Sequence, residues 1–229
     1  MKFSPDQFIF FDWGWGRLNA TILATWFEMA FLVLFSRLIT RKLSTGASMS
    51  RAQNLLEVVV GGVADHIREI TKQEATEFLP FVATLFIFIL FSNLLSVVPF
   101  YLPPTASLST TGALALCVFI AVPFFGLSTR SPLDYLAEYL KPSAFMLPFN
   151  ILGEISRTFA LAIRLYGNLM SGAVISFVLL LIMPFIFPVV MSLLGLLTGA
   201  IQAYIFALLA MVYIASALKR SEVETMEEK

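Results

Sequence analysis

Residues 149–182 read FNILGEISRTFALAIRLYGNLMSGAVISFVLLLI, a long apolar run that carries Glu154, Arg157 and Arg164. At about 1.5 Å per residue, a helix over this range is about 50 Å long. The hydrocarbon core of a bilayer is about 30 Å thick, so a helix of this length has to tilt steeply or bend. The stretch therefore predicts a long, strongly tilted membrane helix.

The composition places the whole chain in the membrane class. Of its 229 residues, 59% are hydrophobic and 13% are charged, and the mean hydropathy is +0.86. Soluble domains are about 25% charged. We expect one membrane domain over residues 1–229. The formal net charge is zero, which gives no basic field for nucleic acid. Cys117, the single cysteine, excludes an internal disulfide and is expected to be a small buried hydrophobe.

Apolar runs and breakers predict an all-α membrane fold. Pro184 and Pro188 separate the last two runs, which predicts a hairpin of two long helices. A further segment has apolar residues at helical spacing with charges between them, so it is expected to lie on the membrane or on a partner. His66, in this segment, is expected at the surface. The ranges are 18–39, 78–100, 108–127, 149–182 and 189–218 for five crossings, and 51–72 for the amphipathic helix.

Basic residues set the expected orientation, because lysine and arginine concentrate in cytoplasmic loops. Lys2 and Arg17 precede the first crossing helix. The other loops that would share a side carry Arg37, Arg41, Lys42, Arg51, Arg68, Lys72, Arg130, Lys141, Lys219, Arg220 and Lys229. We therefore expect an integral membrane protein with the N-terminus outside and the C-terminus in the cytoplasm.

Arg164 is the charged residue that lies deepest in the predicted membrane helix, and its insertion has a high free-energy cost. An arginine at bilayer depth costs about 3 kcal/mol on insertion scales and on the order of 10 kcal/mol in simulations, so it is expected to face protein or water. One helical face carries Arg164 with small and polar residues: Gly167, Asn168, Ser171 and Gly172. Small residues allow another helix to approach closely. Helix packing alone explains the glycines but not the arginine or the asparagine.

A second polar stripe lies in the last run. Ser192, Gly195, Gly199 and Gln202 share one helical face. In a hairpin about Pro184–Pro188, Gln202 and Arg164 come to comparable depth. Two polar groups at this depth are typical of a lined aqueous path.

Nearer the start of the long helix, Asn150, Glu154 and Arg157 form a second polar group. Arg157 fits two interpretations about equally well: a snorkelling or helix-pairing residue, or a residue of an exit path or interface. The sequence contains no Ser/His/Asp set, metal cluster or phosphate loop, so we expect neither catalysis by the chain alone nor a cofactor.

The motif ALAIRLYGNLMSG is similar to the arginine motif of subunit a of F-type ATP synthases. SNLLSVVPFYLPPTASLSTTGALAL and GAIQAYIFALLAMVYIASAL also resemble that family, in order and spacing. The resemblance implies a stator whose two tilted helices curve around a ring of c subunits, with aqueous half-channels for H⁺ or Na⁺. Its implied partners are the c-ring, peripheral-stalk b subunits, the soluble catalytic sector indirectly, and the bilayer.

By the same resemblance, Arg164 is the essential arginine, Gln202 its glutamine neighbour, and Asn168, Ser171 and Ser192 ion-path residues. Gly167, Gly172, Gly195 and Gly199 are expected to face the c-ring. Ala173, Gly195 and Ser107 stand where many members carry an acidic residue or histidine. A neutral hydrated path serves Na⁺ as well as H⁺, so both coupling ions remain open. A stand-alone secondary transporter and a structural membrane anchor are the alternative functions.

Overall fold

The computed structural model describes residues 9–13, 16–41, 51–71, 77–98, 101, 103–129, 147–182 and 187–227. Within these ranges the chain is predominantly helical, as expected. The elements are β1 (Ile9–Trp13), β2 (Gly16–Asn19), α1 (Ala20–Thr40), α2 (Arg51–Thr71), α3 (Leu79–Leu95), the short 3-10 helix η2 (Pro104–Ala106), α4 (Leu108–Thr129), α6 (Leu147–Ile182) and α7 (Phe187–Glu227).

A small β-hairpin precedes α1, and the all-α prediction did not include it. Strands β1 and β2 pair antiparallel, with Trp13 opposite Gly16. The aromatic and β-branched run IFFDW, followed by glycines, is the pattern typical of such a hairpin.

The helices begin and end near the predicted residues, with two differences. Helix α3 stops at Leu95 instead of continuing to residue 100, because Ser96 Oγ donates to Asn93 O at 2.6 Å and closes the last turn. Pro99 follows in the sequence, and a proline sterically disfavours the helical conformation of the residue before it. Helix α7 continues through the acidic tail to Glu227, beyond the predicted residue 218.

In the described ranges, four helices are long and apolar enough to cross a membrane: Thr21–Thr40, Leu108–Ser128, Leu147–Ile182 and Val189–Ala217. Leu79–Leu95 is apolar but shorter, at 17 residues or about 26 Å. Apolar side chains cover much of the outer surface; Trp26 is 64% exposed and Phe27 68%. Such a surface suits contact with lipid or with other membrane subunits.

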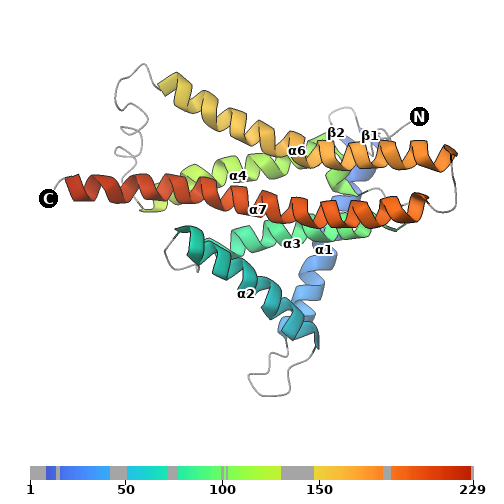
Figure 1. The fold of residues 1–229 in the computed structure, drawn as a ribbon, viewed down its shortest axis with the longest axis horizontal. Helices are drawn as coiled ribbons and strands as arrows, with labels where there is room; N and C mark the ends of the chain where they lie inside the picture. Colours follow the sequence, from blue (N-terminus) through green and yellow to red (C-terminus); the bar gives the residue numbers. More distant parts are fainter. Residues whose placement is uncertain are drawn as a thin grey trace.

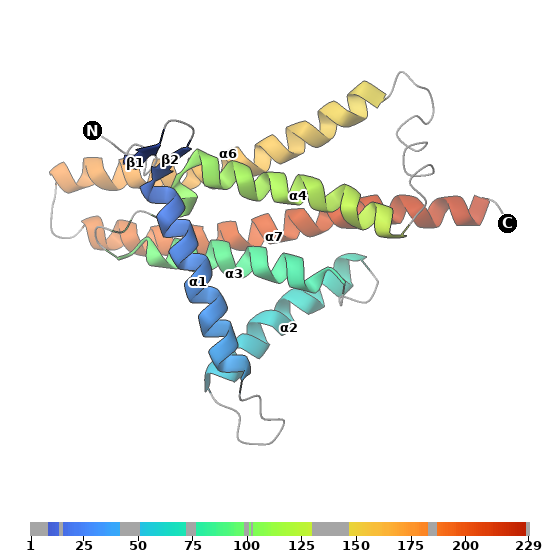
Figure 2. The same cartoon turned by 180° about the vertical axis from the view of Figure 1, so that it is seen from behind.

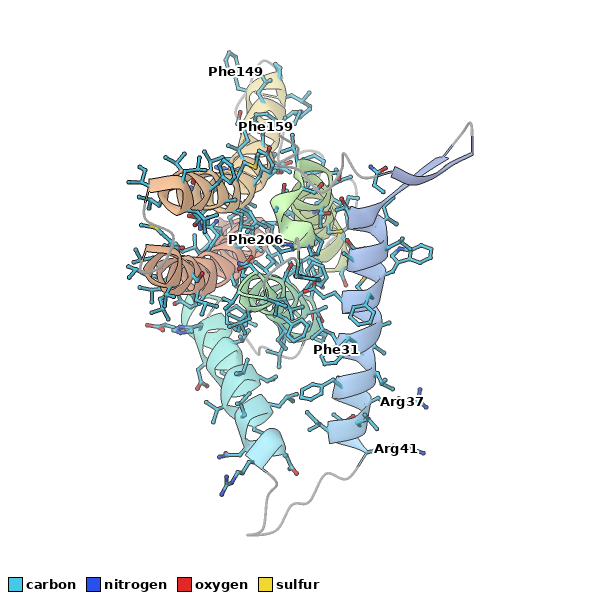
Figure 3. All side chains as sticks on the ribbon, turned by 90° about the vertical axis from the view of Figure 1, so that its right-hand side faces the viewer. Phe31, Arg37, Arg41, Phe149, Phe159 and Phe206 are labelled. Carbon is cyan, nitrogen blue, oxygen red and sulfur yellow. The ribbon has the colours of Figure 1, made fainter. Side chains whose placement is uncertain are left out.

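Helix α1 crosses the remaining spans at a steep angle. Figures 1 and 2 show α3, α4, α6 and α7 running along one common direction, whereas α1 runs across them. Figure 3 looks along that direction: α1 is seen side-on, and the bundle is seen nearly end-on. The first half of α6 diverges from α7, and the labelled Phe149 and Phe159 lie on this diverging part.

The main core lies between α3, α4, α6 and α7. Alanines of α7 recur at helical spacing and let the neighbouring helices approach closely. The buried residues of this cluster are Leu85, Phe88, Ile89, Ala115, Val118, Leu161, Ala162, Leu165, Ala203, Phe206 and Ala210. Cys117, next to this cluster in sequence, is exposed on α4, so the expectation that it is buried was wrong. The buried face of α4 carries Ala115 and Val118 instead.

Helix α2 packs on the rest of the chain. Its Ala64 and Ile67 are buried against Phe78, Val82, Ala207, Met211 and Ile214. The predicted amphipathic helix is therefore confirmed. The surface that α2 covers belongs to α3 and α7 of the same chain.

A single close approach joins α3 to α7. Asn93 Nδ2 donates to Gly199 O at 2.9 Å, and a Cβ at position 199 would lie 2.9 Å from Asn93 Cβ. Gly199 is thus required for packing inside the chain, which differs from the expected contact with a c-ring. A Cβ at Gly167, Gly172 or Gly195 would meet nothing within 4 Å.

We predict that Gly199→Ala lowers the thermal midpoint of the purified protein, whereas Gly172→Ala leaves it unchanged. The added methyl group overpacks the contact with Asn93, at a cost of about 1–3 kcal/mol. Midpoints are measured for both variants in the same detergent, by loss of monodisperse protein on heating. Equal midpoints would contradict the packing role of Gly199.

Candidate functional site

Arg164 lies near the middle of α6, next to a part of the helix that is firmly held. Leu161, Ala162 and Leu165 are buried in the main core, whereas Arg164 is exposed. Within the described residues, Arg164 has no ion-pair partner. The structure therefore holds the helix in place and leaves the guanidinium available to a group outside the described chain.

Gln202 lies on α7 beside the main core. Its neighbour Ala203 belongs to the cluster that contains Leu161 and Leu165, which supports the predicted comparable depth of Gln202 and Arg164. Gln202 is 7% exposed, and its Nε2 has no hydrogen-bond partner in the described chain. An unsatisfied buried donor costs about 1–3 kcal/mol, so Gln202 Nε2 is a candidate contact for an ion, water or another subunit.

A cavity of about 440 Å³ lies between the second half of α6 and the first half of α7. It brings together the polar residues predicted for an ion path. Asn168, Ser171 and Ser192 line it, and Ser171 Oγ donates to Asn168 O at 3.1 Å. The lining also includes Gly172, Ala173, Gly195, Thr198 and, from the segment after α3, Ser96, Tyr101, Pro103 and Ala106. Gln202 and Arg164 do not line it.

The cavity lining contains no Asp, Glu or His. Ala173 and Gly195, which replace the acidic or histidine residues of many family members, both face this cavity. Across the described chain, no group of three or more His, Cys, Asp or Glu could hold a metal ion. The cavity is therefore uncharged, with polar side chains among a partly apolar lining.

A buried hydrogen-bond network lies beside the cavity and joins three elements. Thr105 Oγ1 donates to Asn93 Oδ1 at 3.1 Å and lies 3.1 Å from Ser92 Oγ. Asn93 in turn donates to Gly199 O. The network therefore fixes η2 against α3 and α3 against α7, and so fixes the wall of the cavity that η2 supplies.

Glu28 of α1 is completely buried next to this network. Its carboxylate lies beside the Ser92 hydroxyl. Ser92 Oγ is engaged with Thr105, however, and neither Glu28 oxygen makes a hydrogen bond of acceptable geometry. Burial raises the pKa of Tyr101 to about 12, and the negative charge of Glu28 adds to this effect. The Tyr101 hydroxyl is also buried without a partner.

The sequence analysis gave Glu28 no function. An acidic residue within an apolar run is a recognisable sequence feature of a functional position. The neighbours of Glu28 come from residues 92–105, however, and no sequence spacing connects the two segments.

The second predicted polar group lies on the first turns of α6. Asn150 and Glu154 are half-buried and Arg157 is exposed. The Arg157 guanidinium lies 5.8 Å from the centre of the Tyr213 ring of α7, within range of a cation–π interaction. Arg157 thus has a helix-pairing contact within the chain.

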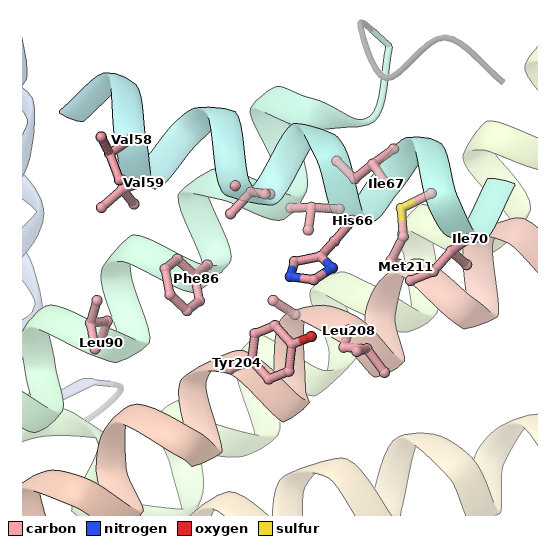
Figure 4. A pocket seen from close by; sticks show the side chains of 14 residues that line it. Val58, Val59, His66, Ile67, Ile70, Phe86, Leu90, Tyr204, Leu208 and Met211 are labelled. Atoms are coloured by element: carbon pink, nitrogen blue, oxygen red, sulfur yellow. The ribbon is translucent and has the colours of Figure 1, made fainter. Parts of the chain in front are cut away.

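A second cavity, of about 280 Å³, lies between α2, α3 and α7, as Figure 4 shows. Its lining is apolar except at His66 and Tyr204, whose rings meet edge to face with centroids 5.4 Å apart. The His66 side chain is 52% exposed, which confirms its predicted surface position.

The fold and the site define an integral membrane protein with a polar, uncharged cavity between its two longest helices. The family model for the ATP synthase A chain matches residues 22–215. Among curated proteins, ATP synthase subunit a 2 of Acaryochloris marina is 58% identical over 217 residues, covering 95% of this chain and 93% of its own. ATP synthase subunit a of Albidiferax ferrireducens is 56% identical over 219 residues, covering 96% and 95%.

The chain belongs to the family of subunit a of F-type ATP synthases. This subunit is a non-catalytic part of the membrane sector of the rotary ATP synthase.

We predict that a cysteine in the cavity reacts with a charged, membrane-impermeant thiol reagent, because that reagent attacks thiolates, which form in water. In a Cys117→Ser background, Ser171→Cys and Ser192→Cys are expected to be labelled in membrane vesicles, as a mass shift detects. Leu193→Cys is the matched control, because Leu193 is 61% exposed and adjacent to Ser192 but lies outside the cavity. Equal labelling at 192 and 193 would show that the cavity is no water path.

Proposed function

We propose that the chain is the stator subunit that passes H⁺ or Na⁺ through two half-channels to and from carboxylates of a rotating c-ring. Ion flow is thereby coupled to ATP synthesis or hydrolysis. The observation that carries the proposal is Arg164: a cation on the longest apolar helix, exposed, with no anionic partner in the described chain. A charged side chain within a membrane span has a high free energy of insertion, so such a residue indicates a functional site.

The proposed partner of Arg164 is a carboxylate of the c-ring, which approaches Arg164 and leaves it again as the ring rotates. Two unit charges 4 Å apart interact by about 4 kcal/mol at an effective dielectric constant of 20. This attraction favours the ionised carboxylate, so a c-subunit releases its bound ion when it reaches the arginine. Arginine stays protonated at any biological pH and does not relay protons. Arg164 thus empties the site and separates the two half-channels.

The cavity lined by Asn168, Ser171 and Ser192 is proposed as part of the outer half-channel, with Gln202 between it and Arg164. The inner half-channel is proposed at the first turns of α6, along Asn150, Glu154 and Arg157. Gly167, Gly172 and Gly195 would face the c-ring, since a Cβ at each meets nothing within 4 Å. Without a barrier, leakage would dissipate about 2.3 kcal/mol per charge for each 100 mV.

We propose five crossings in a bacterial plasma membrane, with the N-terminus outside, the C-terminus cytoplasmic, and α6 and α7 forming a hairpin. Helices α6 and α7 have 36 and 41 residues, which is long enough to cross the bilayer at a large tilt. Helix α1 runs at a steep angle to both of them (Figure 3). The exposed apolar surface suits the proposed partners: the c-ring, the peripheral-stalk b subunits and lipid. The soluble catalytic sector would be reached indirectly.

We predict that Arg164→Ala, in the assembled complex, lowers ATP-driven ion uptake into liposomes at least about 100-fold, because the c-ring carboxylate loses about 4 kcal/mol of stabilisation. The control is Arg68→Ala, which removes an exposed arginine that pairs with Asp65 at 3.5 Å on α2. Assembly is checked by the subunit content of the purified complex.

Normal uptake by the Arg164→Ala complex would contradict the proposal. Uptake by the purified chain alone would favour the stand-alone transporter. A complex that tolerates both Arg164→Leu and Gln202→Leu would favour the structural anchor.

A further inference from the structure

Glu28 is a buried acidic group to which the proposed mechanism gives no function. It lies within the apolar span Thr21–Thr40, its exposed fraction is 0%, and both carboxylate oxygens lack a hydrogen-bond partner. An isolated buried carboxylate is very costly unless it takes up a cation, either a proton or a metal ion. The position of Glu28 therefore indicates cation binding.

No ion pair to Glu28 is formed within the described residues. Four elements contact α1, and two of them, α3 and η2, contain no basic residue. Tyr101 is a titratable group that interacts electrostatically with Glu28. The basic residues of β2, of α2 and of the end of α1 are Arg17, Arg51, Arg68, Arg37 and Arg41. The described chain thus places a carboxyl group here without an ion-pair partner.

Hydroxyl groups lie near the carboxylate. The Ser92 hydroxyl lies beside it, Thr105 Oγ1 lies 3.1 Å from Ser92 Oγ, and the buried Tyr101 hydroxyl has no partner. A carboxylate with neutral hydroxyl groups is the kind of donor set that hard cations prefer. If the cation is a proton, the protonated carboxyl group of Glu28 donates its O–H to one of these hydroxyl oxygens.

The same segment connects Glu28 to the polar cavity. Tyr101, Pro103 and Ala106 line the cavity, and Thr105 between them belongs to the network beside Glu28. The cavity has no acidic residue of its own among its lining. Glu28 is consequently an acidic group that, among the described residues, packs next to a wall of this cavity.

We propose that Glu28 is a cation-binding station of the outer half-channel, where its carboxylate, assisted by Ser92, Thr105 and Tyr101, binds the translocated monovalent cation. This inference rests on the proposed function of the chain. The shared chemistry is a single positive charge held by one carboxylate, and the ion is either H⁺ or Na⁺.

The test uses the whole complex in liposomes, with ATP-driven uptake measured in two ways. Uptake of ²²Na⁺ in the presence of a protonophore reports Na⁺, and a pH-sensitive dye without the protonophore reports H⁺. Glu28→Gln keeps the shape of the side chain and its hydrogen bonding but removes the charge. We expect at least a tenfold loss of uptake, with the complex assembled.

Glu77→Gln is the matched control, because Glu77 is an exposed glutamate just before α3. It is expected to transport at the unaltered rate. Transport at that rate by an assembled Glu28→Gln complex would overturn the inference, because the carboxylate would then be a neutral structural group.

Glu28→Asp decides the question if Glu28→Gln does not assemble. It keeps the charge and withdraws the carboxylate by one methylene, so the cation concentration that gives half-maximal transport is expected to shift at least threefold. An unchanged half-maximal concentration would overturn the inference. Failure of the proposed function is distinguishable, because it would appear as normal transport by Arg164→Ala, whatever Glu28 variants do.

Discussion

The contact between Asn93 and Gly199 is the interaction on which the arrangement of the polar region depends. Asn93 uses its amide NH₂ group to bind the Gly199 carbonyl at 2.9 Å and its amide oxygen to accept from Thr105 at 3.1 Å. One side chain thereby joins α3, η2 and α7. Both bonds are buried, so each is electrostatically stronger than a bond at the surface.

Three features follow from this contact. The close approach holds α7 so that Ala203 and Phe206 pack into the core, which sets the level of Gln202. The bond to Thr105 fixes η2, whose flanking residues Pro103 and Ala106 form a wall of the cavity. Thr105 also occupies Ser92, which leaves the Glu28 carboxylate without a hydrogen bond.

Much of the helical framework was predictable because membrane helices are specified by length and apolarity, which are local properties. The bounds of α2 and α6 agree with the predicted ranges within two residues. The N-terminal hairpin was missed because its strands are short and lie next to the first apolar run. The direction of α1 across the bundle depends on contacts between distant segments, which helix length does not specify.

The residues of the candidate site also differ in whether local sequence or distant contacts determine their position. Asn168, Ser171 and Ser192 could be predicted, because each stripe lies on one helical face and the two helices are neighbours in sequence; the structure places all three on one cavity. The contact of Gly199 inside the chain and the surroundings of Glu28 could not be predicted. Their partners, Asn93 for the one and Ser92 for the other, lie far away in sequence and are defined only by tertiary packing.

Three polar groups of the proposed ion path lack a partner in the part of the chain that the structure describes, in addition to Asn19 Oδ1 and the Tyr101 hydroxyl, and their chemistry differs. Arg164 is an exposed cation, Gln202 Nε2 a buried neutral donor, and Glu28 a buried carboxyl group. A packed core does not retain such groups without compensation, since each costs free energy that apolar replacement would recover. Under the proposed function, a carboxylate of a neighbouring chain pairs with the exposed cation Arg164. The buried carboxyl group of Glu28 would in turn bind a proton or another small cation that enters from the cavity.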